Sequence, residues 1–122
     1  MRKIFMLIPA LVLTLFASGY EEAIDKGIGE GKNVLFMVTT KGCPWCMTMK
    51  ESVIPDGEVQ DELKDYVFVE LDRDNDTYPN DLLYTRHVPT FFVIDPKTQD
   101  LLAERIGYQP KSAFIEFLGA SK

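Results

Sequence analysis

The chain has 122 residues, of which 46% are hydrophobic, and it contains eight glycines, seven prolines and two cysteines. This composition excludes a disordered tract, a fibrous repeat and a small scaffold held together by several disulfides, and it favours one compact domain. The formal net charge is −6 at pH 7. Because the sequence holds no basic cluster, nucleic acid and anionic lipid surfaces are poor partners for it.

The N-terminal segment has the pattern of a secretory signal peptide. A positive head at Arg2–Lys3 precedes a thirteen-residue apolar run, Ile4–Phe16, and the small residues of Ala17–Gly19 fit a cleavage site. An uncleaved membrane anchor is the less favoured alternative, because a spanning helix needs roughly 20 apolar residues. We therefore expect residues 1–19 to direct export to the periplasm, an oxidising compartment, and residues 20–122 to form the domain.

The first half of the domain predicts a helix, a strand and two helical segments. Tyr20–Lys32 favours a short helix whose glycine-rich end frays into a turn. The continuous apolar run Asn33–Thr39 is typical of a strand buried on both faces. A second helix begins after Cys43, and Pro55 must bend or end it. A further helical segment is expected over Asp56–Lys64, with the aspartate as its N-cap.

The second half predicts a strand, a polar loop, a β-hairpin and a last helix. Tyr66–Leu71 is expected to be a strand, and Leu82–Arg86 a short helix at most. Phe91–Ile94 and Leu101–Ile106 are separated by residues of turn composition and predict an antiparallel hairpin. The terminal helix opens at Pro110. Strands joined by helices must be parallel, so the element order predicts an α/β fold with a mixed sheet between helices.

The strongest chemical signal is the sequence Cys43-Pro44-Trp45-Cys46 at the start of a predicted helix. This spacing brings both sulfurs within disulfide reach and leaves Cys43 beside the unpaired N–H groups and positive pole of the helix end. A Cys43 thiolate is therefore stabilised and nucleophilic, while Cys46 lies one turn inside and is suited to resolving a mixed disulfide. Pro44 takes the favoured first-turn position. The alternative is an inert disulfide, whose short loop would add little stability.

A second signal is Val88-Pro89-Thr90, which leads into an apolar strand. A cis bond before Pro89 would turn the backbone of Val88 toward the cysteines, where its N–H and C=O groups would face an extended substrate. Thr90 is the supporting residue at the start of the strand. With the cysteine motif and this proline together, the sequence resembles the thioredoxin superfamily over nearly the whole predicted domain.

Further motifs narrow the resemblance to exported thioredoxin-like proteins related to the periplasmic domain of the transmembrane thiol reductase. These motifs are Gly42–Cys46, Met49–Glu51, Pro55–Val59, Val69–Asp72, Val88–Phe92 and Gly107–Pro110. The resemblance implies a thioredoxin-like three-layer sandwich in which Cys43 attacks, Cys46 resolves and Pro89 is the cis-proline. It also implies protein disulfides as substrates, a membrane thiol reductase as electron donor and no cofactor.

Three other side chains are candidates for roles near the cysteines. Trp45 is expected to form a flat apolar rim for docking partner chains, with packing on the core as the alternative. His87, when protonated, would stabilise a thiolate if it lies near the cysteines; the alternative is a solvated loop histidine. Cytosolic thioredoxins place a buried acid where this chain has Met37. Glu70 can replace that acid only if it faces Cys46, and the alternative is a solvated strand carboxylate.

These features lead to one main hypothesis and two alternatives. The main hypothesis is a monomeric, exported thiol–disulfide oxidoreductase that reduces protein disulfides. An oxidant or isomerase would use the same residues and would differ in having a less negative reduction potential. A carrier of Cu(I) would use the sulfur atoms of Cys43, Cys46, Met47 and Met49. Helical spacing argues against the carrier, because the two methionines project in different directions.

Overall fold

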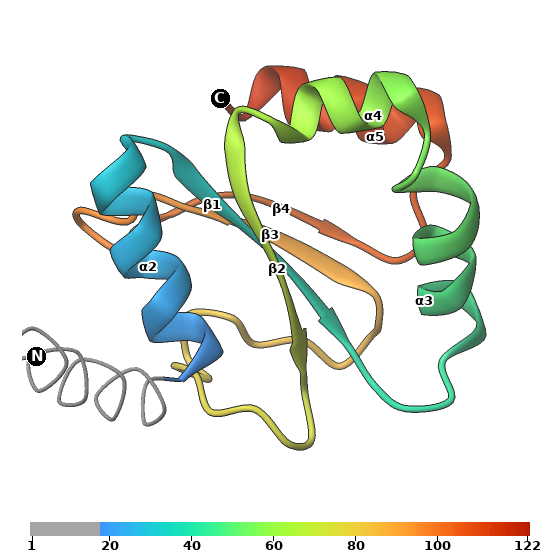
Figure 1. Cartoon of the computed structure of the whole chain (residues 1–122). Coiled ribbons are helices and arrows are strands. Elements are labelled where there is room, and N and C mark those ends of the chain that lie inside the picture. Colours follow the sequence, from blue (N-terminus) through green and yellow to red (C-terminus); the bar gives the residue numbers. More distant parts are fainter. Residues whose placement is uncertain (1–17) are drawn as a thin grey trace, which may run out of the picture.

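The computed structural model describes residues 18–122 and has a mixed sheet at its centre (Figure 1). The sheet has four strands in the order β2-β1-β3-β4. β1 runs parallel to β2 and antiparallel to β3, while β3 pairs with β4 as an antiparallel hairpin. The strands are β1 Asn33–Thr39, β2 Tyr66–Asp72, β3 Thr90–Ile94 and β4 Leu101–Ile106. The predicted signal peptide lies outside the described residues except for Ser18 and Gly19.

Helices cover both faces of this sheet (Figure 1). They are α2 Gly19–Glu30, α3 Pro44–Thr48, the π-helix η1 Met49–Val53, α4 Gly57–Leu63 and α5 Lys111–Ala120. One buried cluster joins α2 to the sheet face that carries Val34, Phe36 and Val38. A second cluster joins the other helices to the opposite face, which carries Leu35 and Met37. The predicted three-layer thioredoxin-like sandwich is therefore confirmed.

Helix α2 is more regular than its sequence predicts. The Ser18 side chain caps it by accepting a hydrogen bond from the Glu21 N–H at 3.1 Å. The helix then continues through Gly27 and Gly29 and ends before Gly31, whose φ of 68° is left-handed. The expected fraying is wrong because Gly27 is buried. There the helix lies so close to the start of β1 and to the turn after β3 that packing holds its last turns.

The segment after the cysteines contains one feature that the sequence did not predict. α3 passes into the π-helix η1 before Pro55, with a hydrogen bond from the Ile54 N–H to the Met49 carbonyl at 2.8 Å. The predicted N-cap of α4 is confirmed: the Asp56 carboxylate accepts bonds from the N–H groups of Glu58 and Val59. A hydrogen bond from Lys111 is the main cause that lowers the pKa of Asp56 below its usual value, and these backbone bonds lower it further.

The long connection between β2 and β3 forms turns instead of the short helix expected at Leu82–Arg86. The N–H groups of Leu82 and Leu83 both donate to the Pro79 carbonyl, at 3.2 and 3.1 Å. Leu83 is 1% exposed and packs in the core cluster on the α2 side of the sheet. This single buried leucine anchors the connection, so that no helix is required to cover the sheet here.

Tyr66 carries a prediction about stability at high pH. Its buried hydroxyl donates to the Leu118 carbonyl at 2.6 Å, and burial raises its pKa to about 12. An unfolded tyrosine has a pKa of about 10, so the folded state keeps a proton that the unfolded state loses. The stabilisation is fully present below pH 10 and is lost as the pH rises toward 12. We expect Tyr66→Phe to flatten the fall in urea midpoint across this range, whereas Tyr84→Phe, at an exposed site, should leave it unchanged.

Candidate active site

The two cysteines lie at the start of α3, which follows β1 in the chain. They are on the sheet face that is covered by α3, η1, α4 and α5. Gly42, with a left-handed φ of 73°, turns the chain between the strand and the helix. Cys43 is the N-cap of α3, and Pro44 is its first residue, as predicted. Cys43 and Cys46 form a disulfide with a Cα–Cα distance of 5.3 Å. The structure therefore shows the oxidised form of the pair.

The surroundings of the two sulfurs differ in a way that suits two different roles. The Cys46 N–H donates to Cys43 Sγ at 3.1 Å. Cys43 is 8% exposed and Cys46 is 2% exposed. A thiolate formed at Cys43 on reduction would lie at the N-terminal end of the helix, where this N–H and the helix dipole favour negative charge. The geometry thus supports attack by Cys43 and shielding of Cys46.

The segment before β3 packs on the same core cluster as the cysteines. The Val88–Pro89 peptide bond is cis. Val88 packs against the core cluster that contains both cysteines. The Thr90 hydroxyl donates to the His87 carbonyl at 2.6 Å and lies 2.9 Å from the Thr85 hydroxyl. These hydrogen bonds of Thr90 hold the segment in place.

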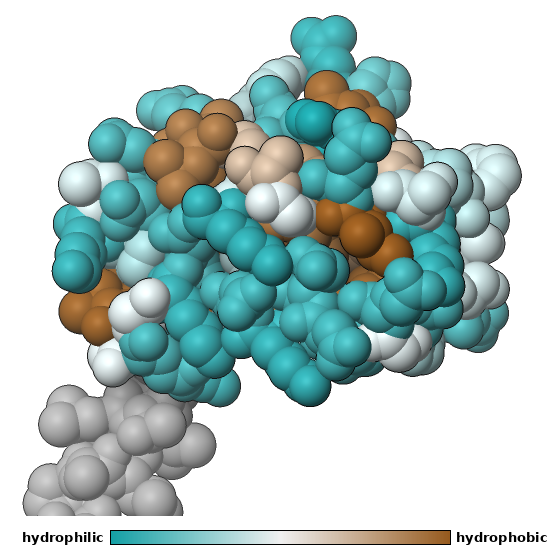
Figure 2. All heavy atoms as spheres, turned by 90° about the horizontal axis from the view of Figure 1, so that it is seen from above, coloured by the Kyte–Doolittle hydropathy of each residue, from teal (hydrophilic) through white to brown (hydrophobic). Residues whose placement is uncertain are grey.

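Aromatic side chains border the disulfide. Trp45 is 58% exposed, and its ring centroid lies 5.1 Å from that of Tyr108. This exposure favours the predicted rim over packing in the core. Tyr108 was not predicted as a site residue; the motif Gly107–Pro110, directly after β4, was the signal that could have identified it. Exposed apolar groups form small separate patches on the face seen from the side of α4 and α5, which is otherwise mainly hydrophilic (Figure 2).

His87 and Glu70 have other surroundings. His87 is exposed, and its side chain makes no hydrogen bond or ion pair within residues 18–122. Glu70 is the register partner of Met37 on the neighbouring parallel strand, so the two side chains share the sheet face that carries the cysteines. Its carboxylate accepts hydrogen bonds from the Thr39 hydroxyl at 2.7 Å and from Lys50 Nζ at 3.0 Å. The hydrogen bonds of Glu70 therefore go to these residues and to neither cysteine.

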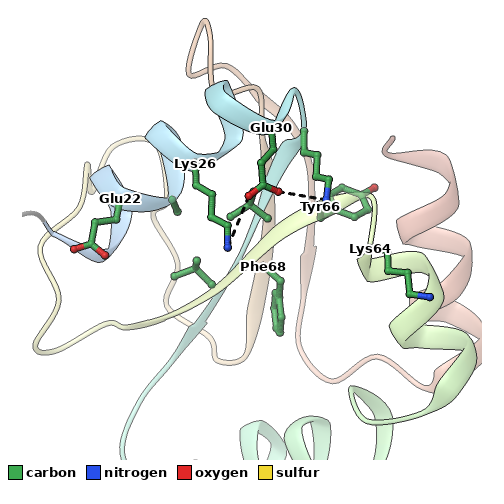
Figure 3. Close-up of a pocket in the computed structure, with 11 residues that line it drawn as sticks. Glu22, Lys26, Glu30, Lys64, Tyr66 and Phe68 are labelled. Carbon is green, nitrogen blue, oxygen red and sulfur yellow. Dashed lines mark ion pairs between the residues drawn. The ribbon is translucent and has the colours of Figure 1, made fainter. Parts of the chain in front are cut away.

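One groove of the surface lies away from the disulfide. A groove of about 500 Å³ runs between α2 and the outer edge of β2, and none of its lining residues belongs to the site (Figure 3). Within the groove, the Glu30 carboxylate forms ion pairs with Lys26 Nζ at 3.9 Å and with Lys32 Nζ at 3.3 Å. Over the described range, no group of three or more His, Cys, Asp or Glu side chains could hold a metal ion. The disulfide therefore lies outside this groove.

The fold and the dithiol pair together define a thiol–disulfide oxidoreductase of thioredoxin type. The family model described as a thioredoxin-like domain matches residues 20–122, so the chain belongs to this family. Comparison with curated protein sequences gives no significant match.

Solved structures agree with the fold. A thioredoxin from Thermus thermophilus is similar, with 22% identity, a TM-score of 0.72 and coverage of 84% of this chain and 83% of that one. The oxidised C-terminal domain of Neisseria meningitidis DsbD has 18% identity, a TM-score of 0.67 and coverage of 84% and 93%. The reduced periplasmic thioredoxin SoxS from Paracoccus pantotrophus has 18% identity, a TM-score of 0.58 and coverage of 75% and 100%.

Proposed function

We propose that the protein is an exported oxidoreductase that reduces disulfide bonds in other proteins. The observation that carries this proposal is the asymmetry of the pair: Cys43 is the more exposed residue, and its sulfur accepts a hydrogen bond from the Cys46 N–H at the start of a helix. Trp45 and the backbone of Val88 flank it as the surface on which an extended substrate docks. The arrangement needs no cofactor, because the two sulfurs themselves carry the electrons.

The reaction follows thiol–disulfide exchange. The Cys43 thiolate attacks one sulfur of a substrate disulfide, forms a mixed disulfide and releases the other substrate sulfur as a thiolate. Cys46 then loses its proton and attacks Cys43 Sγ, which releases the second substrate sulfur. Two electrons have passed to the substrate, and the protein is left with the Cys43–Cys46 disulfide seen here. A donor of two electrons and two protons must restore the dithiol, and we assign that role to a membrane thiol reductase.

Export is the second part of the proposal. It rests on the signal-peptide pattern of residues 1–19, and similarity of fold to a periplasmic thioredoxin agrees with it. Among the residues that the structure describes, no helix is long and apolar enough to cross a membrane. We propose a monomeric periplasmic protein, in which two electrons for each cycle arrive from a membrane donor because the compartment itself oxidises thiols.

The positions of the two methionine sulfur atoms favour the oxidoreductase over a carrier of Cu(I). Met47 is 51% exposed, whereas Met49 is fully buried. The Met49 thioether already accepts a hydrogen bond from the Gln109 N–H. The two methionines thus lie in different environments, and they do not gather around the cysteines as ligands of one soft metal ion would.

The decisive experiment is the equilibrium reduction potential of the Cys43–Cys46 pair in a thioredoxin or glutathione redox buffer. For a reductant we expect a value near that of thioredoxin, roughly −270 mV. A value toward roughly −120 mV would reverse the direction of electron flow and make the protein an oxidant. The absence of a reversible couple would overturn the oxidoreductase function and favour metal binding.

A further inference from the structure

The segment that follows β4 is tied to the disulfide site by an uncommon hydrogen bond. The backbone N–H of Gln109 donates to the thioether Sδ of Met49 at 3.4 Å. The Met49 side chain is fully buried in the core cluster that also contains both cysteines. A thioether is a weak acceptor, and backbone N–H groups normally bond to oxygen. The bond therefore marks a contact that ordinary core packing does not require.

The backbone of Met49 occupies an equally specific place. Its N–H points back at the carbonyls of Trp45 and Cys46, in the turn that holds the active-site spacer. Its carbonyl accepts the N–H of Ile54 in the π-helical turn. Such turns occur frequently at functional sites, because they shift the side chains that follow them out of α-helical register. Met49 thus stands where α3 becomes η1, and its side chain points at the segment after β4.

The segment Gly107–Gln109 contacts both the proline segment before β3 and the aromatic rim formed by Trp45. The Gly107 N–H donates to the Pro89 carbonyl at 2.7 Å. The Tyr108 ring lies against the ring of Trp45, with centroids 5.1 Å apart. Within the segment, the side-chain amide of Gln109 donates a hydrogen bond to the Gly107 carbonyl at 3.2 Å. A shift of these three residues would move the aromatic rim relative to the proline segment.

We propose that Met49 is a positioning residue for the reaction with protein disulfides. Its thioether holds Gly107–Gln109 in register with the active-site helix and thereby sets the spacing between the aromatic rim and Pro89. The inference rests on the oxidoreductase function proposed above. A polypeptide substrate must fit between the aromatic rim and Pro89, whereas a small disulfide needs only access to Cys43. Loss of the sulfur acceptor should therefore weaken docking of proteins and leave the chemistry of the dithiol unchanged.

The test is Met49→Leu, which keeps the buried volume and removes the acceptor. With dithiothreitol as reductant, we expect the KM for insulin to rise roughly two- to threefold, the low end of the range for one hydrogen bond, because a thioether is a weak acceptor. The kcat for insulin, the rate with glutathione disulfide and the reduction potential should stay at wild-type values. In the oxidised protein, hydrogen exchange of the Gln109 amide should be faster than in the wild type.

Met37→Leu is the matched control, because Met37 is equally buried in the same cluster and its sulfur makes no hydrogen bond within residues 18–122. It should change none of these readouts. An unchanged insulin KM in Met49→Leu would overturn the proposal, as would an equal loss of reaction with glutathione disulfide. A wild-type protein that reacts with neither substrate would instead overturn the proposed function, which separates the two failures.

Discussion

Serine at position 46 should convert the protein into a trap for its substrates, whereas serine at position 43 should abolish the reaction. In Cys46→Ser, Cys43 can still attack a substrate disulfide, but no second thiol is present to release the mixed disulfide. In Cys43→Ser, the remaining thiol is 2% exposed and lies inside the helix, so substrates do not reach it. Insulin reduction should fall to the uncatalysed rate in both variants.

The two variants control for each other, because each removes one sulfur atom of the same disulfide. After incubation with a disulfide-bonded protein, non-reducing electrophoresis should show the mixed disulfide in Cys46→Ser and not in Cys43→Ser. Dithiothreitol should release the bound protein. If the trapped species formed in Cys43→Ser instead, the assignment of attacking and resolving thiols would be reversed.

Much of the fold could be predicted because its elements differ sharply in pattern. The apolar run Asn33–Thr39 and the hairpin strand Leu101–Ile106 match β1 and β4 residue for residue. Pro55 and Asp56 mark the boundary before α4 as expected, since proline lacks an N–H and aspartate caps well. The end of α2 could not be predicted in this way, because tertiary packing there overrides the low helix propensity of glycine.

The candidate site was predictable only where its chemistry is local in sequence. The cysteine pair and its place at a helix start follow from four consecutive residues, Cys43-Pro44-Trp45-Cys46. The contacts of Tyr108 with Trp45 and of Gln109 with Met49 join segments about 60 residues apart, and nothing in either segment alone indicates its partner. The π-helical turn is equally hidden, since its sequence is compatible with an ordinary helix.

Glu70 shows why a residue's type and spacing are not enough to assign a catalytic role. The sequence suggested it as a replacement for the missing buried acid at Met37, provided that it faces Cys46. The strand register does place it on the correct face of the sheet, beside Met37. Yet Lys50, one helical turn beyond Cys46, forms an ion pair with it at 3.0 Å, and Thr39 takes a further bond. Only the three-dimensional structure could decide where that carboxylate makes its contacts.

Alanine at position 27 should destabilise the fold, although alanine is a better helix former than glycine. A Cβ atom on Gly27 would lie 2.8 Å from Val34 Cγ2, 2.9 Å from the Lys32 carbonyl oxygen and 3.1 Å from Pro96 Cβ. The carbonyl belongs to the backbone and cannot move by changing a rotamer. We expect Gly27→Ala to lower the free energy of unfolding by about 1–3 kcal/mol, the usual effect of overpacking. Urea denaturation of the oxidised protein measures this change.

Gly29 supplies the matched control, because it lies two residues further along the same helix and a Cβ there would meet no atom within 4 Å. At this position alanine adds no clash. It lowers the backbone entropy of the unfolded chain and has a higher helix propensity than glycine, and both effects stabilise the fold. Gly29→Ala should therefore raise the free energy of unfolding by roughly 0.5–1 kcal/mol. Opposite signs at the two positions would show that the approach of α2 to β1 and to the turn after β3 requires glycine at position 27. Stabilisation by both substitutions would contradict that close approach and place α2 further from the sheet.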